Sequence, residues 1–310
     1  MLKAETTAAE PASVWPAIAQ VLVGVMLFSV SDTMAKYLRQ SLPAVEIAWL
    51  RYTVFLLFGV TLAGRRRFAG LWPRRASLQV LRGVTLLGSA VLFITGLSYL
   101  QMAEASAISF VSPAFITALS VLFLREQVGV HRWTATLVGL IGVVVVIRPG
   151  TGALQTAALF PLASAACWAV AMIATRLIGA QDRSETTLLW SAGVGLAILT
   201  AALPFDFVPP SWGQVGLGLC LGVTASSGQY LLILAYRRAT ASVLAPFSYL
   251  QLLASAALGY AVFGSVPDAM AFAGAAIIIA SGLYIVYRER LRARQEAVRT
   301  AGTVRPAARV

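Results

Sequence analysis

The chain has 310 residues, of which 59% are hydrophobic and only 12% are charged, and its mean hydropathy is +0.80. Soluble domains carry about 25% charged residues, so this composition excludes a soluble catalytic domain and indicates a membrane protein. The net charge of +12 would also suit a nucleic-acid-binding protein, but the positions of the basic residues favour a signal for membrane orientation.

Ten apolar segments follow one another along the chain. A helix needs about 20 residues to cross the hydrocarbon core of a bilayer, and the chain has room for ten such crossings. The fifth segment is the shortest. The sequence therefore predicts an all-α membrane protein with ten transmembrane helices, at residues 15–37, 44–63, 78–98, 102–124, 133–148, 157–178, 186–203, 213–236, 241–263 and 269–287.

The second half of the chain weakly repeats the first, at an offset that drifts between 136 and 141 residues. Matching positions include Trp49 with Trp190, Phe93 with Tyr230, and Ala105-Ser106-Ala107-Ile108 with Ala241-Ser242-Val243-Leu244. Each copy has five spans, and because five is odd, the second copy must enter the membrane from the opposite side. We therefore predict two inverted repeats, residues 15–148 and 157–287, flanked by an N-terminal tail (1–14) and a basic C-terminal tail (288–310). Many secondary transporters are built in this way around one central site.

The basic residues gather in the even-numbered loops and in the C-terminal tail. Lys and Arg accumulate in cytoplasmic loops, so we expect both termini to be cytoplasmic, with the arginine-rich tail contacting anionic headgroups. The mixed charges of the first residues and the polar interruptions of the first span argue against a cleaved signal peptide. The residues that carry this pattern are Arg65, Arg66, Arg67, Arg74, Arg75, Arg125, Arg132, Arg183, Arg237 and Arg238.

Catalytic and cofactor motifs are missing from the sequence. It has no GxxxxGK[ST] phosphate loop, no GxSxG elbow and no HExxH pair, and its single histidine, His131, lies in a short basic loop. Cys167 and Cys220 lie in separate spans and are interpreted as small buried apolar residues. We therefore expect neither an enzyme nor a metal or cofactor site.

Ionisable side chains within the spans are the first candidates for a site, because each costs about 2.5–3.5 kcal/mol at mid-helix. Asp32 and Arg51 lie deepest, at similar depth on neighbouring helices, and are predicted to form an ion pair. The pair would either lock the first hairpin or present a carboxylate to the cargo, and the sequence leaves both open. The others lie near predicted helix ends, where long side chains reach the interface: Lys36, Glu46, Arg82, Glu104 and Arg176.

Aromatic residues near mid-depth form a second candidate set. Binding pockets are mostly apolar and aromatic with a few placed polar groups. Trp168 is the strongest single candidate, because it starts mid-span, away from the interfaces where Trp usually collects. Each residue alone would equally suit a helix–helix contact. The predicted cargo-binding set is Phe93, Tyr99, Phe110, Trp168, Tyr230, Phe247 and Tyr249, with polar contacts from Gln229, Gln251, Ser31 and Asp32.

Two prolines lie in corresponding spans of the two repeats, Pro113 in the fourth and Pro246 in the ninth. Proline removes a backbone donor and kinks a helix. Paired breaks of this kind indicate the site and hinges of a repeat transporter. We therefore predict hinges at Pro113 and Pro246.

The chain resembles the drug/metabolite transporter superfamily, in particular its EamA-type ten-helix members. The resemblance covers residues 15–287 and is clearest in the stretch from Ala103-Glu104-Ala105-Ser106-Ala107 to Ser112-Pro113, in Leu124-Arg125-Glu126-Gln127, and in Trp133 with Gly139 to Gly142. The second copy has Ala241-Ser242-Val243 and Gly274 to Gly282, and it departs from the family at Phe263-Gly264-Ser265, where an acidic residue is common. Within the superfamily the chain is most similar to bacterial YddG-type exporters. This implies an inner-membrane protein that moves amino acids, particularly aromatic ones, out of the cytoplasm.

These features predict an alternating-access transporter for amino acids or related small metabolites, in the bacterial inner membrane. One chain holds both repeats, so it needs no second copy to complete the site. Export of cationic drugs or polyamines, with Asp32 as the binding carboxylate, is the alternative within the same class. A membrane enzyme or a lipid-handling scaffold is the alternative from another class, which the missing catalytic cluster and the repeat disfavour.

Overall fold

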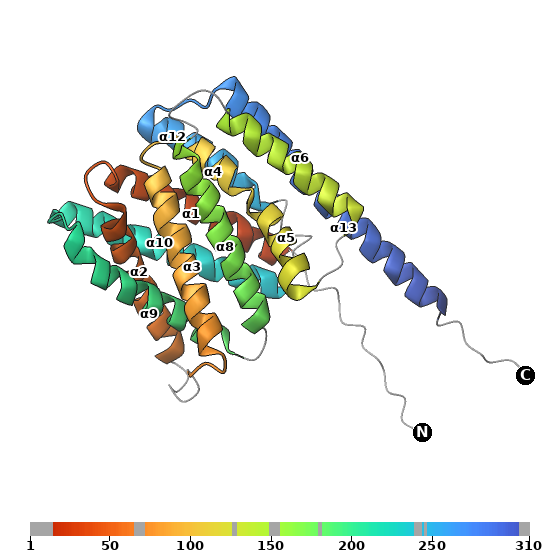
Figure 1. Cartoon of the computed structure of the whole chain (residues 1–310), viewed down its shortest axis with the longest axis horizontal. Coiled ribbons are helices and arrows are strands. Elements are labelled where there is room, and N and C mark those ends of the chain that lie inside the picture. Colours follow the sequence, from red (N-terminus) through yellow and green to blue (C-terminus); the bar gives the residue numbers. More distant parts are fainter. Residues whose placement is uncertain are drawn as a thin grey trace, which may run out of the picture.

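The computed structural model describes residues 15–64, 72–125, 129–148, 156–178, 182–238, 244 and 247–303. Within these ranges every regular element is a helix (Figure 1). The elements are α1 (Trp15–Leu38), α2 (Ala44–Gly64), α3 (Ala76–Gly96), α4 (Met102–Ser109), α5 (Ser112–Leu124), α6 (Val130–Ile147), α8 (Leu159–Ile178), α9 (Ser184–Ala202), the 3-10 helix η2 (Leu203–Phe205), α10 (Trp212–Arg238), α12 (Leu250–Phe263) and α13 (Ala269–Thr303).

Length and composition mark the protein as a multi-pass membrane protein. Seven helical segments are long and apolar enough to cross a bilayer, with α4 and α5 together counting as one of them. Three shorter apolar segments, Trp133–Ile147, Leu250–Phe263 and Ala269–Ile285, coincide with the fifth, ninth and tenth predicted spans. The membrane character of the chain is thus confirmed, and the full count of ten crossings stays a prediction.

Two elements differ from the sequence prediction. The fourth span is divided into α4 and α5, which are separated at Phe110 and Val111, just before Pro113 in the first turn of α5. Proline has no backbone N–H and its ring crowds the preceding turn, so one continuous helix is not maintained there.

The second difference is the length of α13, which continues to Thr303 although the sequence predicts a separate tail from residue 288. That stretch is rich in Arg, Glu, Gln, Leu and Ala, all good helix formers, and has no Gly or Pro before Gly302.

The helices of the two halves pack in matching pairs. α1 packs on α10 as α3 packs on α8, α2 contacts α10 as α3 contacts α9, and α12 contacts α1 as α5 contacts α8. Three further contacts join helices of corresponding spans: α2 with α9, α4 with α12, and α6 with α13, which run side by side along one edge (Figure 1). Exchanging the two halves therefore maps the first six contacts onto one another in pairs, and it maps each of the last three onto a contact between the same two spans.

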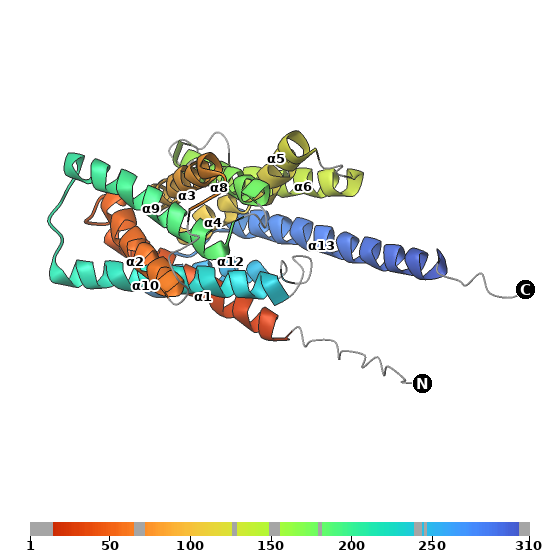
Figure 2. The same cartoon turned by 90° about the horizontal axis from the view of Figure 1, so that it is seen from below.

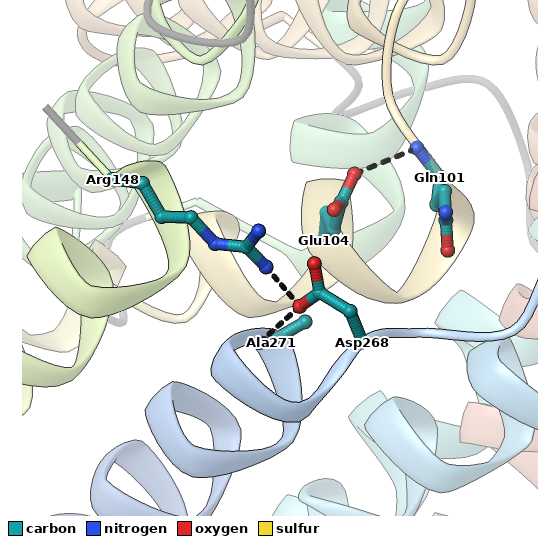
Figure 3. Close-up of polar contacts among 5 residues, drawn as sticks. All are labelled: Gln101, Glu104, Arg148, Asp268 and Ala271. Atoms are coloured by element: carbon teal, nitrogen blue, oxygen red, sulfur yellow. Dashed lines mark hydrogen bonds and ion pairs between the residues drawn. The ribbon is translucent and has the colours of Figure 1, made fainter. Parts of the chain in front are cut away.

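One end of the helices, called here the odd-loop end, carries four connections: 39–43, 97–101, 203–211 and 264–268. Gln214 Nε2 donates to Ser41 Oγ at 2.7 Å, and Lys36 Nζ donates to the carbonyls of Leu97 and Leu100. Arg148, after α6, pairs with Asp268, before α13, next to Glu104 at the beginning of α4 (Figure 3).

The described flanks of the second and sixth connections meet at the opposite end. The backbone N–H of Arg74 donates to Asp182 Oδ1 at 2.9 Å, and Gln79 Nε2 donates to the other carboxylate oxygen of Asp182 at 2.9 Å. Figure 2 shows α1 beginning and α13 ending at one end of the molecule, and the connection between α9 and α10 lying at the other.

The largest group of buried apolar side chains lies toward the odd-loop end. A smaller buried cluster lies near the other end, between α1, α10 and Leu244. Large aromatic side chains near helix ends are exposed instead, such as Trp72 (82%) and Trp212 (91%), as expected for the interfacial belts of a membrane protein. The buried set at the odd-loop end includes Leu38, Leu42, Ile47, Leu97, Leu100, Met102 and Leu221.

Candidate functional site

A cavity of about 340 Å³ lies between the two halves of the chain. Its walls come from α1, α2, α3, α4 and α5 of the first half, and from α8, α10 and α12 of the second. The edge pair α6 and α13 contributes no lining residue among those described, and neither does α9. A volume of this size falls at the lower end of the range for small-molecule sites.

The apolar wall is aromatic, and three of the predicted aromatic residues belong to it. Phe93, Phe110 and Trp168 line the cavity, from α3, the α4–α5 break and α8 respectively. Phe28 and Phe55 join them, and the sequence analysis did not select these two. Both sit at mid-depth in apolar spans, a position they share with ordinary packing residues, so their sequence context carries no distinguishing signal.

The predicted polar residues Asp32, Gln229 and Gln251 also line the cavity. Asp32 is 8% exposed and shares the cavity lining with Arg51 and Gln251. Among the described residues, Asp32 and Arg51 do not approach to the 4.0 Å of an ion pair, although both face the cavity. The two side chains therefore share the cavity wall but do not form the predicted ion pair.

Arg82 lies in the cavity lining and not at the membrane interface that its sequence position predicts. We expected its side chain to reach the interface near a helix end, but it is 5% exposed and lines the cavity. Its Nε donates to Thr175 Oγ1 at 2.7 Å and its Nη1 to Thr187 O at 3.3 Å and to Ser191 Oγ. Polar groups of α8 and α9 therefore hold the Arg82 side chain inward. The sequence of α3 alone does not indicate these acceptors.

Five other predicted site residues lie outside the cavity lining. Tyr99 is 63% exposed and stacks on Phe160, because it falls in the connection at the odd-loop end. Ser31 is buried and donates to Leu221 O at 3.2 Å, so its hydroxyl joins α1 to α10. The others contact neighbouring side chains: Tyr230 packs edge-on against Phe58, Phe247 packs on the small cluster of α1 and α10, and Tyr249 stacks on Phe110.

Of the two predicted hinges, Pro113 follows the break between α4 and α5, next to the cavity-lining Ser112. Pro246 lies outside the described residues, as do Arg65, Arg66 and Arg67 of the second loop. A hinge function at Pro113 agrees with its position and stays a prediction.

The remaining ionisable residues of the spans make structural contacts. Glu46 Oε2 accepts from the backbone N–H of Val208 at 3.2 Å, and Glu104 completes a capping box with Gln101 at the beginning of α4 (Figure 3). The described residues contain no group of three His, Cys, Asp or Glu side chains able to hold a metal ion.

Comparison with known proteins identifies the family. The model of the EamA-like transporter family matches the chain twice, over residues 15–148 and 155–287. An S-adenosylmethionine uptake transporter of Rickettsia bellii is 30% identical over 87% of this chain and 92% of its own. A riboflavin transporter of Rhizobium johnstonii is 30% identical over 94% and 97%, and a pseudopaline exporter of Pseudomonas aeruginosa is 27% identical over 81% and 89%.

The fold is also known from experiment. A solved crystal structure superposes with a TM-score of 0.66 at 18% identity, covering 88% of this chain and 97% of the other. The double family match falls on the two halves whose helices exchange contacts in pairs. The central cavity lies between these two matching halves, and the chain belongs to the EamA-like transporter family.

Proposed function

We propose that this protein is an alternating-access transporter that moves amino acids, aromatic ones in particular, or similar small metabolites through the central cavity. The observation that carries the proposal is the lining of that cavity, which combines the aromatic rings of Phe93, Phe110 and Trp168 with the polar side chains of Asp32, Gln229 and Gln251. Aromatic faces suit a flat apolar group, while the carboxylate and amides suit an amine and other polar groups.

Two inverted repeats of five spans are part of the proposal. The paired contacts between the halves, and the meeting of odd-numbered connections at one end, both support it. With the basic even-numbered loops on the cytoplasmic side, both termini would face the cytoplasm of a bacterial cell. The relatives named above include an uptake transporter and an exporter. In the proposed mechanism, solute gradients and coupling set the direction of net flux.

Flux into proteoliposomes tests the proposal. The purified chain is reconstituted, and uptake of a panel of labelled amino acids is measured with and without an imposed pH gradient. Saturable uptake that aromatic amino acids compete away supports the proposed cargo. Absence of amino-acid flux in vesicles that move cationic drugs or polyamines would replace it with the alternative based on Asp32, which the position of this carboxylate in the cavity lining keeps open.

Trp168→Ala should raise the KM for an aromatic amino acid at least about tenfold, because one face of the binding cavity is lost. Trp212→Ala is the matched control, since Trp212 is 91% exposed and lies outside the lining. Both variants are compared by initial uptake rates at equal amounts of folded protein. Unchanged uptake by a folded Trp168→Ala protein would remove this residue from the site.

A further inference from the structure

We propose that Arg51 and Arg82 form an anion-binding pole in the central cavity, which selects cargo that carries a carboxylate. This inference rests on the proposed function, because it names the chemical class that the same cavity takes. It gives a binding function to Arg82, which makes its polar contacts with α8 and α9 while lining the cavity.

The position of Arg82 is determined by its contacts. Thr175 Oγ1 accepts from Nε, while Thr187 O and Ser191 Oγ accept from Nη1. Among the described residues no hydrogen bond reaches Nη2, and the acceptors of the other two nitrogens are uncharged. The guanidinium is therefore oriented by neutral groups while its charge has no carboxylate partner. A buried charge without a counter-ion is costly, and an anionic ligand removes that cost.

Arg51 adds a second positive charge to the same cavity. It is half-buried on α2 and makes no hydrogen bond or ion pair with the described residues. The described lining thus contains two guanidinium groups and one carboxylate, that of Asp32, which leaves a net positive charge. Planar guanidinium groups match the geometry of a carboxylate, so this imbalance favours a carboxylate over a cation.

A helix N-terminus in the lining also suits an anionic ligand. α5 begins at Ser112, which also lines the cavity, and the first turn of a helix carries partial positive charge. The cargo class that fits is a small carboxylate with a flat apolar group, with Asp32 available to an amine where the cargo has one.

Three probes that share a phenyl ring separate the charges: 3-phenylpropionate (anion), L-phenylalanine (zwitterion) and phenethylamine (cation). Binding is measured as the rise in melting temperature of the purified full-length protein over a probe titration, since a ligand of the folded state stabilises it by mass action. The variants are Arg51→Gln and, as a matched control, Arg125→Gln, whose arginine is exposed and outside the lining.

We expect both carboxylate probes to stabilise the wild type and Arg125→Gln, and phenethylamine to do so at least about tenfold more weakly. Arg51→Gln should weaken the effect of 3-phenylpropionate at least about tenfold, as for the loss of a charge-assisted hydrogen bond. Any of three results would overturn the pole. Phenethylamine could stabilise the protein more than the carboxylate probes do, or Arg51→Gln could show the full rise in melting temperature with 3-phenylpropionate. The third is that neither carboxylate probe changes the melting temperature.

Arg82 is tested without removing its charge, because its loss would also break the contact between α3 and α9. Thr175→Val removes the acceptor of Nε and keeps the shape of the side chain. It should weaken binding of 3-phenylpropionate and leave phenethylamine unaffected, and equal affinity for the carboxylate would exclude Arg82 from the pole. Flux assays separate the two proposals. Transport of cations without carboxylate binding would keep the transport function and exclude the anion-binding pole. Carboxylate binding without any flux would keep the pole and exclude the transport function.

Discussion

Most charged side chains of the spans are used to join helix ends. Lys36 donates to two carbonyls of the connection after α3 and lies 5.6 Å from the centre of the Phe263 ring, so it ties α1 to both halves of the chain. Glu46 and Glu104 accept from backbone N–H groups. Only Asp32, Arg51 and Arg82 remain facing the cavity among the described residues, which is why the specificity argument depends on these three.

At the odd-loop end, the hydrogen bond from Arg148 and the backbone N–H of Ala271 hold the pKa of Asp268 at about 2, below its usual 3.8 (Figure 3). Because the folded-state pKa is lowered, the stabilisation is present above pH 3.8 and is lost as the pH falls toward 2. Asp268→Asn should therefore lower the melting temperature at pH 6 by only about 1–2 °C, since the pair is exposed and screened.

Melting curves of the wild type and Asp268→Asn across this pH range provide the check. The difference between the two proteins should vanish only below about pH 2, where the folded carboxylate is protonated, and it should shrink at high salt. Asparagine keeps an oxygen for the Ala271 N–H, so Asp268→Ala, which loses the cap as well, should be less stable than Asp268→Asn at every pH. A pH-independent difference between the wild type and Asp268→Asn would show that the charge has no part in it.

At the scale of the element, small residues determine how closely helices of the two halves approach. A Cβ on Gly142 of α6 would lie 2.9 Å from the carbonyl of Gly274 on α13, and one on Gly24 of α1 would lie 3.2 Å from the carbonyl of Gly228 on α10. Helices in a membrane gain little from hydrophobic burial and associate through such close packing. These glycines therefore join the halves rather than supply turns.

Gly142→Ala should destabilise the protein by about 1–3 kcal/mol, because the added methyl group has to push α6 away from α13. Gly193→Ala, in α9, is the matched control, since a Cβ there meets nothing within 4 Å. Alanine is the better helix former, so this control should be neutral or slightly stabilising. Thermal unfolding in one detergent compares the two, and equal stability of both variants would mean that the α6–α13 contact tolerates separation.

At the scale of the whole molecule, cross-half hydrogen bonds and buried apolar side chains join the two halves toward the odd-loop end. Ser106 of α4 and Ser255 of α12 are 3.1 Å apart between their Oγ atoms, and Ser255 is fully buried. Alternating access requires each end of the cavity to open in turn. The contact between α4 and α12 therefore has to separate during the proposed cycle.

A disulfide between Ser106→Cys and Ser255→Cys, in a Cys167→Ala and Cys220→Ala background, should reduce transport at least about tenfold, because it holds α4 and α12 together. The short distance between the hydroxyls makes a disulfide geometrically feasible. Uptake is measured before oxidation, after oxidation and after reduction, with each single cysteine as a control. Full uptake by the cross-linked protein would mean that this end stays closed during transport.

The sequence by itself determined that the chain lies in a membrane, which segments are apolar helices, and which family it belongs to. These properties follow from composition, span length and local motifs, which depend on residues close together in the chain. Arg51 of the predicted ion pair lines the cavity, as do six residues of the predicted cargo-binding set: Asp32, Phe93, Phe110, Trp168, Gln229 and Gln251.

Only the tertiary structure decided which face of each helix meets the cavity. Spans that are apolar all round have no amphipathic face to indicate their orientation, so Tyr99, Tyr230 and Ser31 were chosen on depth alone and lie outside the lining. Arg82 shows the opposite case, because the hydroxyl and carbonyl groups that turn it inward come from α8 and α9, 93 to 109 residues away in the chain. Contacts at such separations are decided by how the two halves pack, and no local pattern in the sequence records them.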